Sequence, residues 1–153
     1  MPKRYWLLKT EPDVYSIDDL KRDGETCWDG VRNYQARNFM RDDMKVGDEV
    51  FFYHSNAEPT GIAGIAKVSK AGHDDVTAID PNDVHHDPKA TPQKPIWSRV
   101  NVKFVRKFAR VIALDELKKV KELTGMPLLQ RGQRLSVQPV SEEHFAIIKV
   151  MAK

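Results

Sequence analysis

Residues Trp28 to Asn38 read W-D-G-V-R-N-Y-Q-A-R-N, and this stretch decides how the rest of the chain is interpreted. Asp29-Gly30 is a dipeptide typical of turns. Asn33 after it can cap a helix, which we expect to continue to about Met44. Four side chains of this helix share one stripe at helical spacing: Tyr34, Arg37, Asn38 and Arg41.

An aromatic ring, two guanidinium groups and two amides therefore gather at one helix start, beside the indole of Trp28. Such groups can stack on a planar base, bond its edge and contact a phosphate. The alternative is an ordinary capped surface helix, with Ala36, Phe39 and Met40 facing a core. Periodicity alone favours this alternative.

The 153 residues suffice for one domain of ordinary size, which we expect to span residues 1–153. Apolar residues make up 41% of the chain, and no apolar run approaches the length of a membrane span. The N-terminus lacks the pattern of a signal peptide. Cys27 is the single cysteine, which excludes an intrachain disulfide and suits a reducing compartment. We expect a cytoplasmic protein without a membrane partner, and a monomer is favoured.

The net charge of +3 is unevenly distributed. Residues 1–97 hold 13 basic and 17 acidic side chains and have a net charge of −4. Residues 98–153 hold 12 basic and 5 acidic side chains and have a net charge of +7. A local basic surface indicates a polyanionic partner, although solvated lysines on strands and helices explain the same charge.

Turn residues divide the chain into short strands and helices. Strands are expected at residues 5–9, 49–54, 61–68, 97–104 and 134–140. Helices are expected at residues 16–22, 33–44, 114–123 and from 141 onward. Residues 71–95 are rich in Asp, Pro and His and predict a long loop. Short strands interrupted by helices, without the spacing of βαβ units, indicate an α+β fold with a small closed or nearly closed sheet.

Three local features sharpen these expectations. Ser16 with Asp19 forms an acidic variant of the capping box at a helix start. The segment 49–54 has apolar side chains on both faces, so this strand is expected to be buried. The alternation of the 97–104 strand slips at Val105-Arg106, as a β-bulge would cause.

Common enzyme signatures are missing. The sequence has no G-x-x-x-x-G-K-[ST], G-x-G-x-x-G, G-x-S-x-G or H-E-x-x-H motif. Cys27 could be a nucleophile, but a buried thiol is the stronger interpretation. Glu11 and Asp13 could form an acid–base pair, but two carboxylates on a turn are the stronger interpretation. Five side chains of the long loop could hold a divalent ion, although their spacing matches no calcium or structural zinc motif: Asp80, Asp83, His85, His86 and Asp87. We expect no catalytic residue, metal or cofactor.

The three tryptophans occupy different contexts. Trp6 lies in an apolar strand and is expected in the core. Trp28 and Trp97 stand at strand or loop edges beside polar residues. Each is either packed in the ordinary way or offers a stacking surface. The strand end 53–56 adds hydroxyl, imidazole and amide groups that could bond a base.

Five segments, in order along nearly the whole chain, resemble the EVE domain of the thymocyte nuclear protein family and of small bacterial proteins. They are residues 5–12 (YWLLKTEP), 28–38 (WDGVRNYQARN), 47–55 (GDEVFFYHS), 61–64 (GIAG) and 134–139 (RLSVQP). The resemblance implies a PUA-like fold, a small mixed β-barrel flanked by helices and related to the ASCH and YTH modules. It also implies a pocket for a nucleobase, with modified cytosines in DNA as the expected ligand class.

Carried over by position, the resemblance implies seven nucleobase-binding residues: Trp28, Asn33, Tyr34, Tyr53, Ser55, Trp97 and Arg134. In this interpretation an indole stacks on the flipped base, and amide and hydroxyl groups bond its edge. Four basic side chains would steer phosphate: Arg37, Arg41, Arg99 and Lys103.

The leading hypothesis is a non-catalytic reader of modified bases in DNA or RNA. A second is a small PUA- or ASCH-like enzyme that acts on a nucleotide or modified nucleoside, with His54, Glu11 or an aspartate of the pocket as its base. A third is a structural adaptor whose pocket has no ligand.

Overall fold

A computed structural model describes residues 3–132 and 134–153 of the chain. The strands are β1 (Tyr5–Thr10), β2 (Glu25–Trp28), β3 (Glu49–His54), β4 (Gly61–Asp74), β5 (Ser98–Ala113) and β6 (Val137–Val140). The helices are α1 (Ile17–Asp23), α2 (Tyr34–Asn38), α3 (Leu114–Lys118) and α4 (Glu142–Met151). Within the described residues, no helix is long and apolar enough to cross a membrane.

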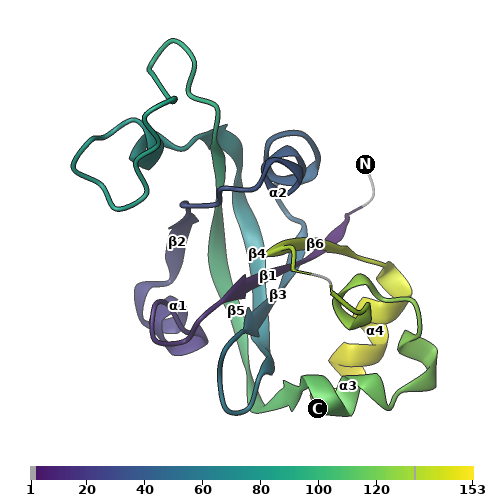
Figure 1. Cartoon of the computed structure of the whole chain (residues 1–153). Helices are drawn as coiled ribbons and strands as arrows, with labels where there is room; N and C mark the ends of the chain where they lie inside the picture. The colour runs from purple at the N-terminus through teal and green to yellow at the C-terminus, as the bar shows by residue number, and fades with distance from the viewer. Residues whose placement is uncertain (1–2, 133) are drawn as a thin grey trace.

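The six strands form one mixed sheet in the order β2-β5-β4-β3-β1-β6. β1 runs parallel to β3, and the remaining neighbours are antiparallel. β1 and β6 cross β4 and β5 at a large angle, so the sheet is strongly twisted (Figure 1). The expected α+β, PUA-like class is confirmed. The expected barrel is not closed, because the described residues of β2 and β6 stay at opposite ends of the strand order.

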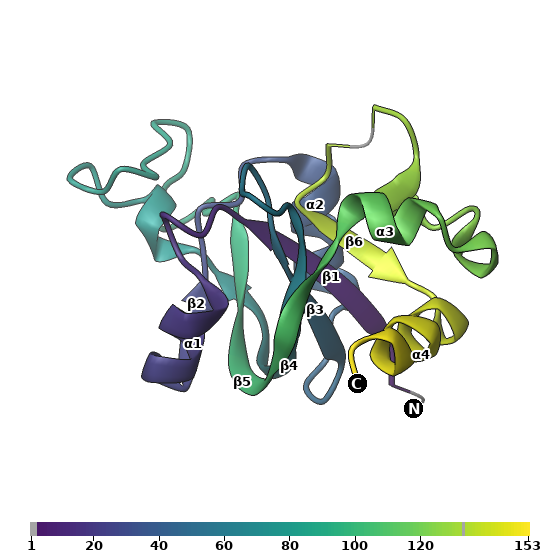
Figure 2. The same cartoon turned by 90° about the horizontal axis from the view of Figure 1, so that it is seen from below.

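The sheet is covered on both faces. Val50 and Phe52 of β3 pack with the core residues of α1 and α2, whereas Phe51 and Tyr53 pack with those of α3 and α4. Figure 2 shows α1 and α4 at opposite ends of the sheet. The prediction of a strand buried on both faces is confirmed, because successive side chains alternate between two apolar layers.

Capping side chains fix where the two N-terminal helices begin. The Ser16 side chain accepts from Asp19 N while the Asp19 side chain accepts from Ser16 N, so the predicted capping box is confirmed. Asn33 caps α2 as expected, since its Oδ1 accepts from Ala36 N at 3.0 Å.

The helical segment runs to Met44 as expected, but only its first part is α-helical. α2 ends at Asn38, and a π-helical turn follows over Phe39–Asp43, closed by the Met44 N to Phe39 O hydrogen bond of 2.9 Å. The wider turn lets Phe39 lie against Trp6, with ring centroids 5.4 Å apart. Trp6 is fully buried, as predicted.

The long hairpin of β4 and β5 extends beyond its predicted ends. β4 continues to Asp74, so part of the expected 71–95 loop is strand, and a 3₁₀ turn follows at Val76–Ala78. Ile65 pairs with Arg106 and Ala66 with Phe104, which leaves Val105 as the extra residue of the predicted bulge.

Three further boundaries differ from expectation. β2 was not predicted at all, and β6 begins at Val137 rather than at Arg134. The expected 114–123 helix is interrupted, because α3 ends at Lys118 and a separate 3₁₀ turn covers Lys121–Leu123. Short elements such as these are held by tertiary packing rather than by local propensity.

Candidate binding pocket

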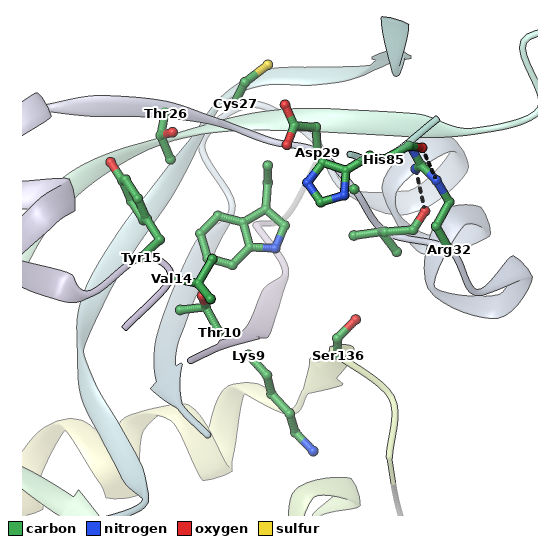
Figure 3. Close-up of a pocket in the computed structure, with 13 residues that line it drawn as sticks. Lys9, Thr10, Val14, Tyr15, Thr26, Cys27, Asp29, Arg32, His85 and Ser136 are labelled. Atoms are coloured by element: carbon green, nitrogen blue, oxygen red, sulfur yellow. Dashed lines mark hydrogen bonds between the residues drawn. The ribbon is translucent and has the colours of Figure 1, made fainter. Parts of the chain in front are cut away.

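A cavity of about 560 Å³ opens beside β2, at the end of β1. Four segments far apart in the sequence form its walls (Figure 3): residues 9–15, residues 26–32, His85 of the long loop and Ser136 before β6. The volume lies within the range of about 300–1,000 Å³ that is usual for small-molecule sites. A single flipped base is small enough to enter it.

Trp28 forms an apolar wall of this cavity. The rings of Phe52 and Tyr15 stand nearly perpendicular to its ring, with centroids 5.4 and 6.5 Å away. The indoles of Trp6 and Trp97 donate to carboxylates, at 2.9 and 2.7 Å. Among the described residues, the Trp28 N–H has no such partner. Its donor is therefore left to a ligand or to water.

The polar groups of the cavity stand on two sides. The Asp29 carboxylate and the His85 imidazole lie next to each other, whereas Lys9 and Ser136 lie across the cavity from them (Figure 3). Burial raises the pKa of Asp29, and the negative charge of Asp75 raises it further. Burial lowers the pKa of Lys9. The cavity thus combines an aromatic wall with hydrogen-bond acceptors and donors.

Arg32 fastens the long loop over the cavity. Its Nε and Nη2 donate to the carbonyl of His85 at 3.1 and 2.6 Å, and its Nη1 pairs with the fully buried Asp75 at 3.0 Å. The His85 ring lies so close to Gly30 that a Cβ there would stand 2.7 Å from it. Gly30 also has a φ of +78°, which other residues rarely adopt.

The thiol of Cys27 lies 3.8 Å from His73 Nε2. It donates to Asn101 Oδ1 at 3.0 Å, and burial raises its pKa, which favours the neutral form. The other candidate bases, His54 and Glu11, do not line the cavity. His54 Nε2 accepts from Ile17 N at 3.1 Å.

Of the seven expected base-binding residues, the structure places Trp28 in the cavity. Tyr34 and Trp97 instead stack on each other beside it, with centroids 4.8 Å apart. Tyr53 is buried behind Lys9, whose Nζ lies 5.7 Å from its ring, and burial raises the pKa of Tyr53 to about 12.

The remaining three lie near the cavity without lining it. Ser55 N donates to the carbonyl of Thr10, a lining residue, at 2.9 Å. Asn33 is exposed, and its side chain is engaged in capping α2. Arg134 is exposed, two positions before the lining residue Ser136.

Three of the four expected phosphate-steering residues have partners in the protein. Arg37 Nη1 donates to Ile96 O at 2.8 Å. Arg41 forms a forked contact with the Asp42 carboxylate. Arg99 is largely buried, with Nη1 3.8 Å from Asp29. Lys103 is exposed, and no ion pair or hydrogen bond within the described ranges involves its side chain.

Sequence reasoning missed Lys9, Ser136 and the role of His85 on the cavity wall. Lys9 and Ser136 belong to the quoted segments 5–12 and 134–139, but nothing in their local pattern distinguishes them. His85 was considered as a metal ligand. Over the described residues, no three His, Cys, Asp or Glu side chains are grouped to hold a metal ion, because the loop carboxylates cap turns of their own loop or accept from Trp97.

Comparison with known proteins adds independent findings. The model of the EVE domain family matches residues 4–151. Thymocyte nuclear protein 1 of Rattus norvegicus is 47% identical, over 94% of this chain and 71% of its own length. A crystal structure of a Pseudomonas syringae protein superposes with a TM-score of 0.93 at 51% identity, over 97% of this chain and 99% of the other.

The human THYN1 protein, crystallised in complex with DNA that contains 5-methylcytosine, superposes with a TM-score of 0.88 at 44% identity, over 99% of this chain and 98% of the other. An ASCH protein of Zymomonas mobilis has a TM-score of 0.56 at 10% identity, over 99% of this chain and all of the other. At that identity the likeness concerns the fold alone.

Proposed function

The chain belongs to the EVE domain family, and we propose that it is a nucleic-acid-binding module that accommodates a modified base, 5-methylcytosine foremost, in the cavity beside Trp28. The human THYN1 complex with 5-methylcytosine-containing DNA supports this proposal, because that relative shares the fold over 99% of this chain. The protein would act without catalysis, as a reader of the modification.

One observation carries the proposal: among the described residues, neither the Trp28 N–H nor the Asp29 carboxylate makes a hydrogen bond, and both side chains line a base-sized cavity. Flipping a base costs a few kcal/mol of unstacking. A new base–aromatic contact contributes about 1–3 kcal/mol, which offsets much of that cost. The hydrogen bonds that the edge of the base makes with the cavity then determine which bases bind.

The structure supports a division of roles within the proposed site. Trp28 and Tyr15 provide the aromatic wall, and Asp29, Thr10 and Ser136 stand where they can bond a base edge. Tyr34 and Trp97 support the loop that carries His85. The other expected base-binding residues would act from outside the cavity wall: Asn33, Tyr53, Ser55 and Arg134. The single domain and the cytoplasmic location expected from the sequence stay predictions.

The test is a binding screen at one stated salt concentration. Labelled duplexes carry cytosine, 5-methylcytosine, 5-hydroxymethylcytosine or 6-methyladenine at one central position, and a single-stranded RNA of matching sequence is included. We expect the methylated cytosine duplex to bind more tightly than the unmodified one. Equal affinity for all duplexes contradicts the proposal, and preferential binding of RNA overturns DNA as the ligand.

A matched pair of variants locates the site. Trp28→Leu removes an aromatic side chain from the cavity and is expected to flatten the preference for the modified base. Tyr34→Leu removes an exposed aromatic side chain outside the cavity and is expected to preserve that preference. Both variants are first compared with the wild type by thermal unfolding.

A second candidate, an enzyme acting on a modified nucleoside, rests on the position of Asp29. Its carboxylate lies in the cavity, and burial raises its pKa, which is typical of a general acid or base. Incubation with modified nucleosides and oligonucleotides, followed by mass spectrometry, tests this candidate. A product that disappears with Asp29→Asn supports it, and binding without turnover contradicts it.

A further inference from the structure

The carboxylate of Asp29 is an acceptor that the fold leaves unused. Across the described parts of the chain it accepts no hydrogen bond, and its one ion pair is with Arg99 Nη1 at 3.8 Å. Asp75, the neighbouring buried carboxylate, accepts from Gly30 N, Arg32 Nη1 and both the N–H and the hydroxyl of Thr77. Asp75 is therefore structural, whereas Asp29 lines the cavity and its oxygens keep their acceptor capacity in the described structure.

Arg99 is the ion-pair partner of this carboxylate. Its side chain is 19% exposed, and its Nε is buried without a hydrogen-bond partner in the described structure. At 3.8 Å the guanidinium attracts the Asp29 carboxylate without occupying its oxygens as close hydrogen bonds would. Arg99 was expected to steer phosphate, but its burial beside Asp29 suits a counter-ion instead.

The edge of the base determines what such an acceptor can bind. Cytosine presents an amino donor at position 4, whereas thymine presents a carbonyl oxygen there. 5-Methylcytosine and thymine share the pyrimidine skeleton and the methyl group, so they differ only along this edge, at position 4 and at N3, which carries a hydrogen in thymine. A carboxylate facing the thymine oxygen places two acceptors together and leaves both unpaired, which is costly inside a cavity.

We propose that Asp29 is the specificity-determining residue of the cavity: it accepts a hydrogen bond from the exocyclic amino group of a cytosine-type base and rejects thymine. Arg99 is the positioning residue that orients the carboxylate. This inference rests on the proposed function, since it assigns the selecting group within the same site.

The experiment compares two single-stranded oligonucleotides that differ only in one central base, 5-methylcytosine or thymine. Single strands remove the difference in pairing energy that a thymine mismatch in a duplex would introduce. For the wild type we expect roughly 10- to 100-fold tighter binding of 5-methylcytosine, the discrimination usual for one well-placed hydrogen-bonded contact.

Asp29→Asn keeps the shape and supplies either a donor or an acceptor, so the preference is expected to fall to within about threefold. Asp74→Asn, an exposed carboxylate that does not line the cavity, is the matched control and is expected to keep the full preference. Asp29→Ala serves as a second variant with the acceptor removed, and thermal unfolding shows that each variant is folded.

Arg99 is tested by the ratio of the affinities for 5-methylcytosine and thymine, together with the salt dependence of binding. Arg99→Met is expected to reduce the preference for 5-methylcytosine over thymine without changing the salt slope, and Arg99→Lys is expected to restore part of it. Equal weakening of both oligonucleotides with a shallower salt slope identifies Arg99 as a phosphate contact and overturns its positioning role.

The outcomes separate this inference from the proposed function. If the wild type binds 5-methylcytosine no better than unmodified cytosine, the proposed function fails. If the wild type prefers 5-methylcytosine over cytosine but Asp29→Asn still rejects thymine, the cavity reads bases through another group and the assignment of Asp29 fails. If the wild type binds thymine as tightly as 5-methylcytosine, the amino group is not read and the inference also fails.

Discussion

The rings of Tyr34 and Trp97 stack on each other, with centroids 4.8 Å apart and planes inclined by 23°. The guanidinium of Arg32 lies 5.5 Å from the Trp97 ring. Two aromatic side chains that the sequence suggested as base contacts therefore serve each other as partners. Trp97 stacks on Tyr34 and does not line the cavity, so its contacts fix the base of the long loop rather than offer a face to a ligand.

Replacing Trp97 is expected to affect stability rather than base preference. Trp97→Phe keeps a ring beside Tyr34 but removes the indole donor that bonds Asp87 at 2.7 Å. Losing this part-buried hydrogen bond to a charged group lowers the free energy of unfolding. Denaturant unfolding measures this loss, and the affinity ratio for methylated over unmodified cytosine should stay at the wild-type value. A flattened ratio in the folded variant would return Trp97 to the binding site.

The basic residues are expected to separate into two groups. Lys103→Ala should weaken binding of all sequences alike and lower the salt slope by about one unit, because one phosphate of the nucleic acid is then no longer neutralised by the protein. Lys118→Ala, which removes an exposed lysine of α3, is the control and should leave the slope unchanged. Titrations at several salt concentrations measure both slopes.

Arg37 is expected to act on the loop instead. Its Nη1 bonds the carbonyl of Ile96, which has a φ of +64°, a conformation that a β-branched residue rarely adopts. Arg37→Ala should therefore lower stability by about 1–2 kcal/mol and increase proteolysis within the long loop. Unchanged stability with a reduced salt slope would show that Arg37 contacts phosphate.

His54 is expected to make stability depend on pH. Burial lowers the pKa of His54 from its ordinary 6.5. The unfolded chain then binds a proton more readily than the folded one, so the free energy of unfolding is constant above about pH 6.5 and decreases as pH falls below it, by at most about 1.4 kcal/mol per pH unit.

The matched variant is His54→Gln, which can still accept from Ile17 N but does not titrate. Denaturant unfolding at pH 7.5 and pH 5.5 should show a larger loss for the wild type than for the variant. An identical pH dependence in the two proteins would exclude His54 as the source.

The chain is expected to unfold as one cooperative unit. The two apolar layers share one sheet, so neither can open without exposing the strands of the other. Circular dichroism and tryptophan fluorescence should report coincident transitions, and limited proteolysis should cut first within residues 79–97. Two separate transitions would divide the chain into two domains.

Much of the fold could be predicted from local signals. The capping box of Ser16 and the two-sided strand β3 depend on residues that are neighbours in sequence, as does the extra residue Val105. β2 could not be predicted in this way, because Glu25–Trp28 has no long apolar alternation and becomes a strand only by pairing with β5.

The cavity was harder to predict than the fold. Trp28 could be singled out because it opens the quoted motif, and it lines the cavity. Lys9, His85 and Ser136 come together only through the pairing of β1 and the anchoring of the long loop. Conversely, Arg99 looked like a free cation in an alternating strand, and only its burial beside Asp29 reveals a different partner.

The anchoring of His85 has a consequence for protein engineering. Arg32 holds this residue by its main-chain carbonyl, so this anchor remains when the side chain is changed. Position 85 can therefore be randomised while the wall around it stays in place. A library at this one codon, selected on oligonucleotides with bulkier or charged modifications, is a direct route to readers of new base chemistry.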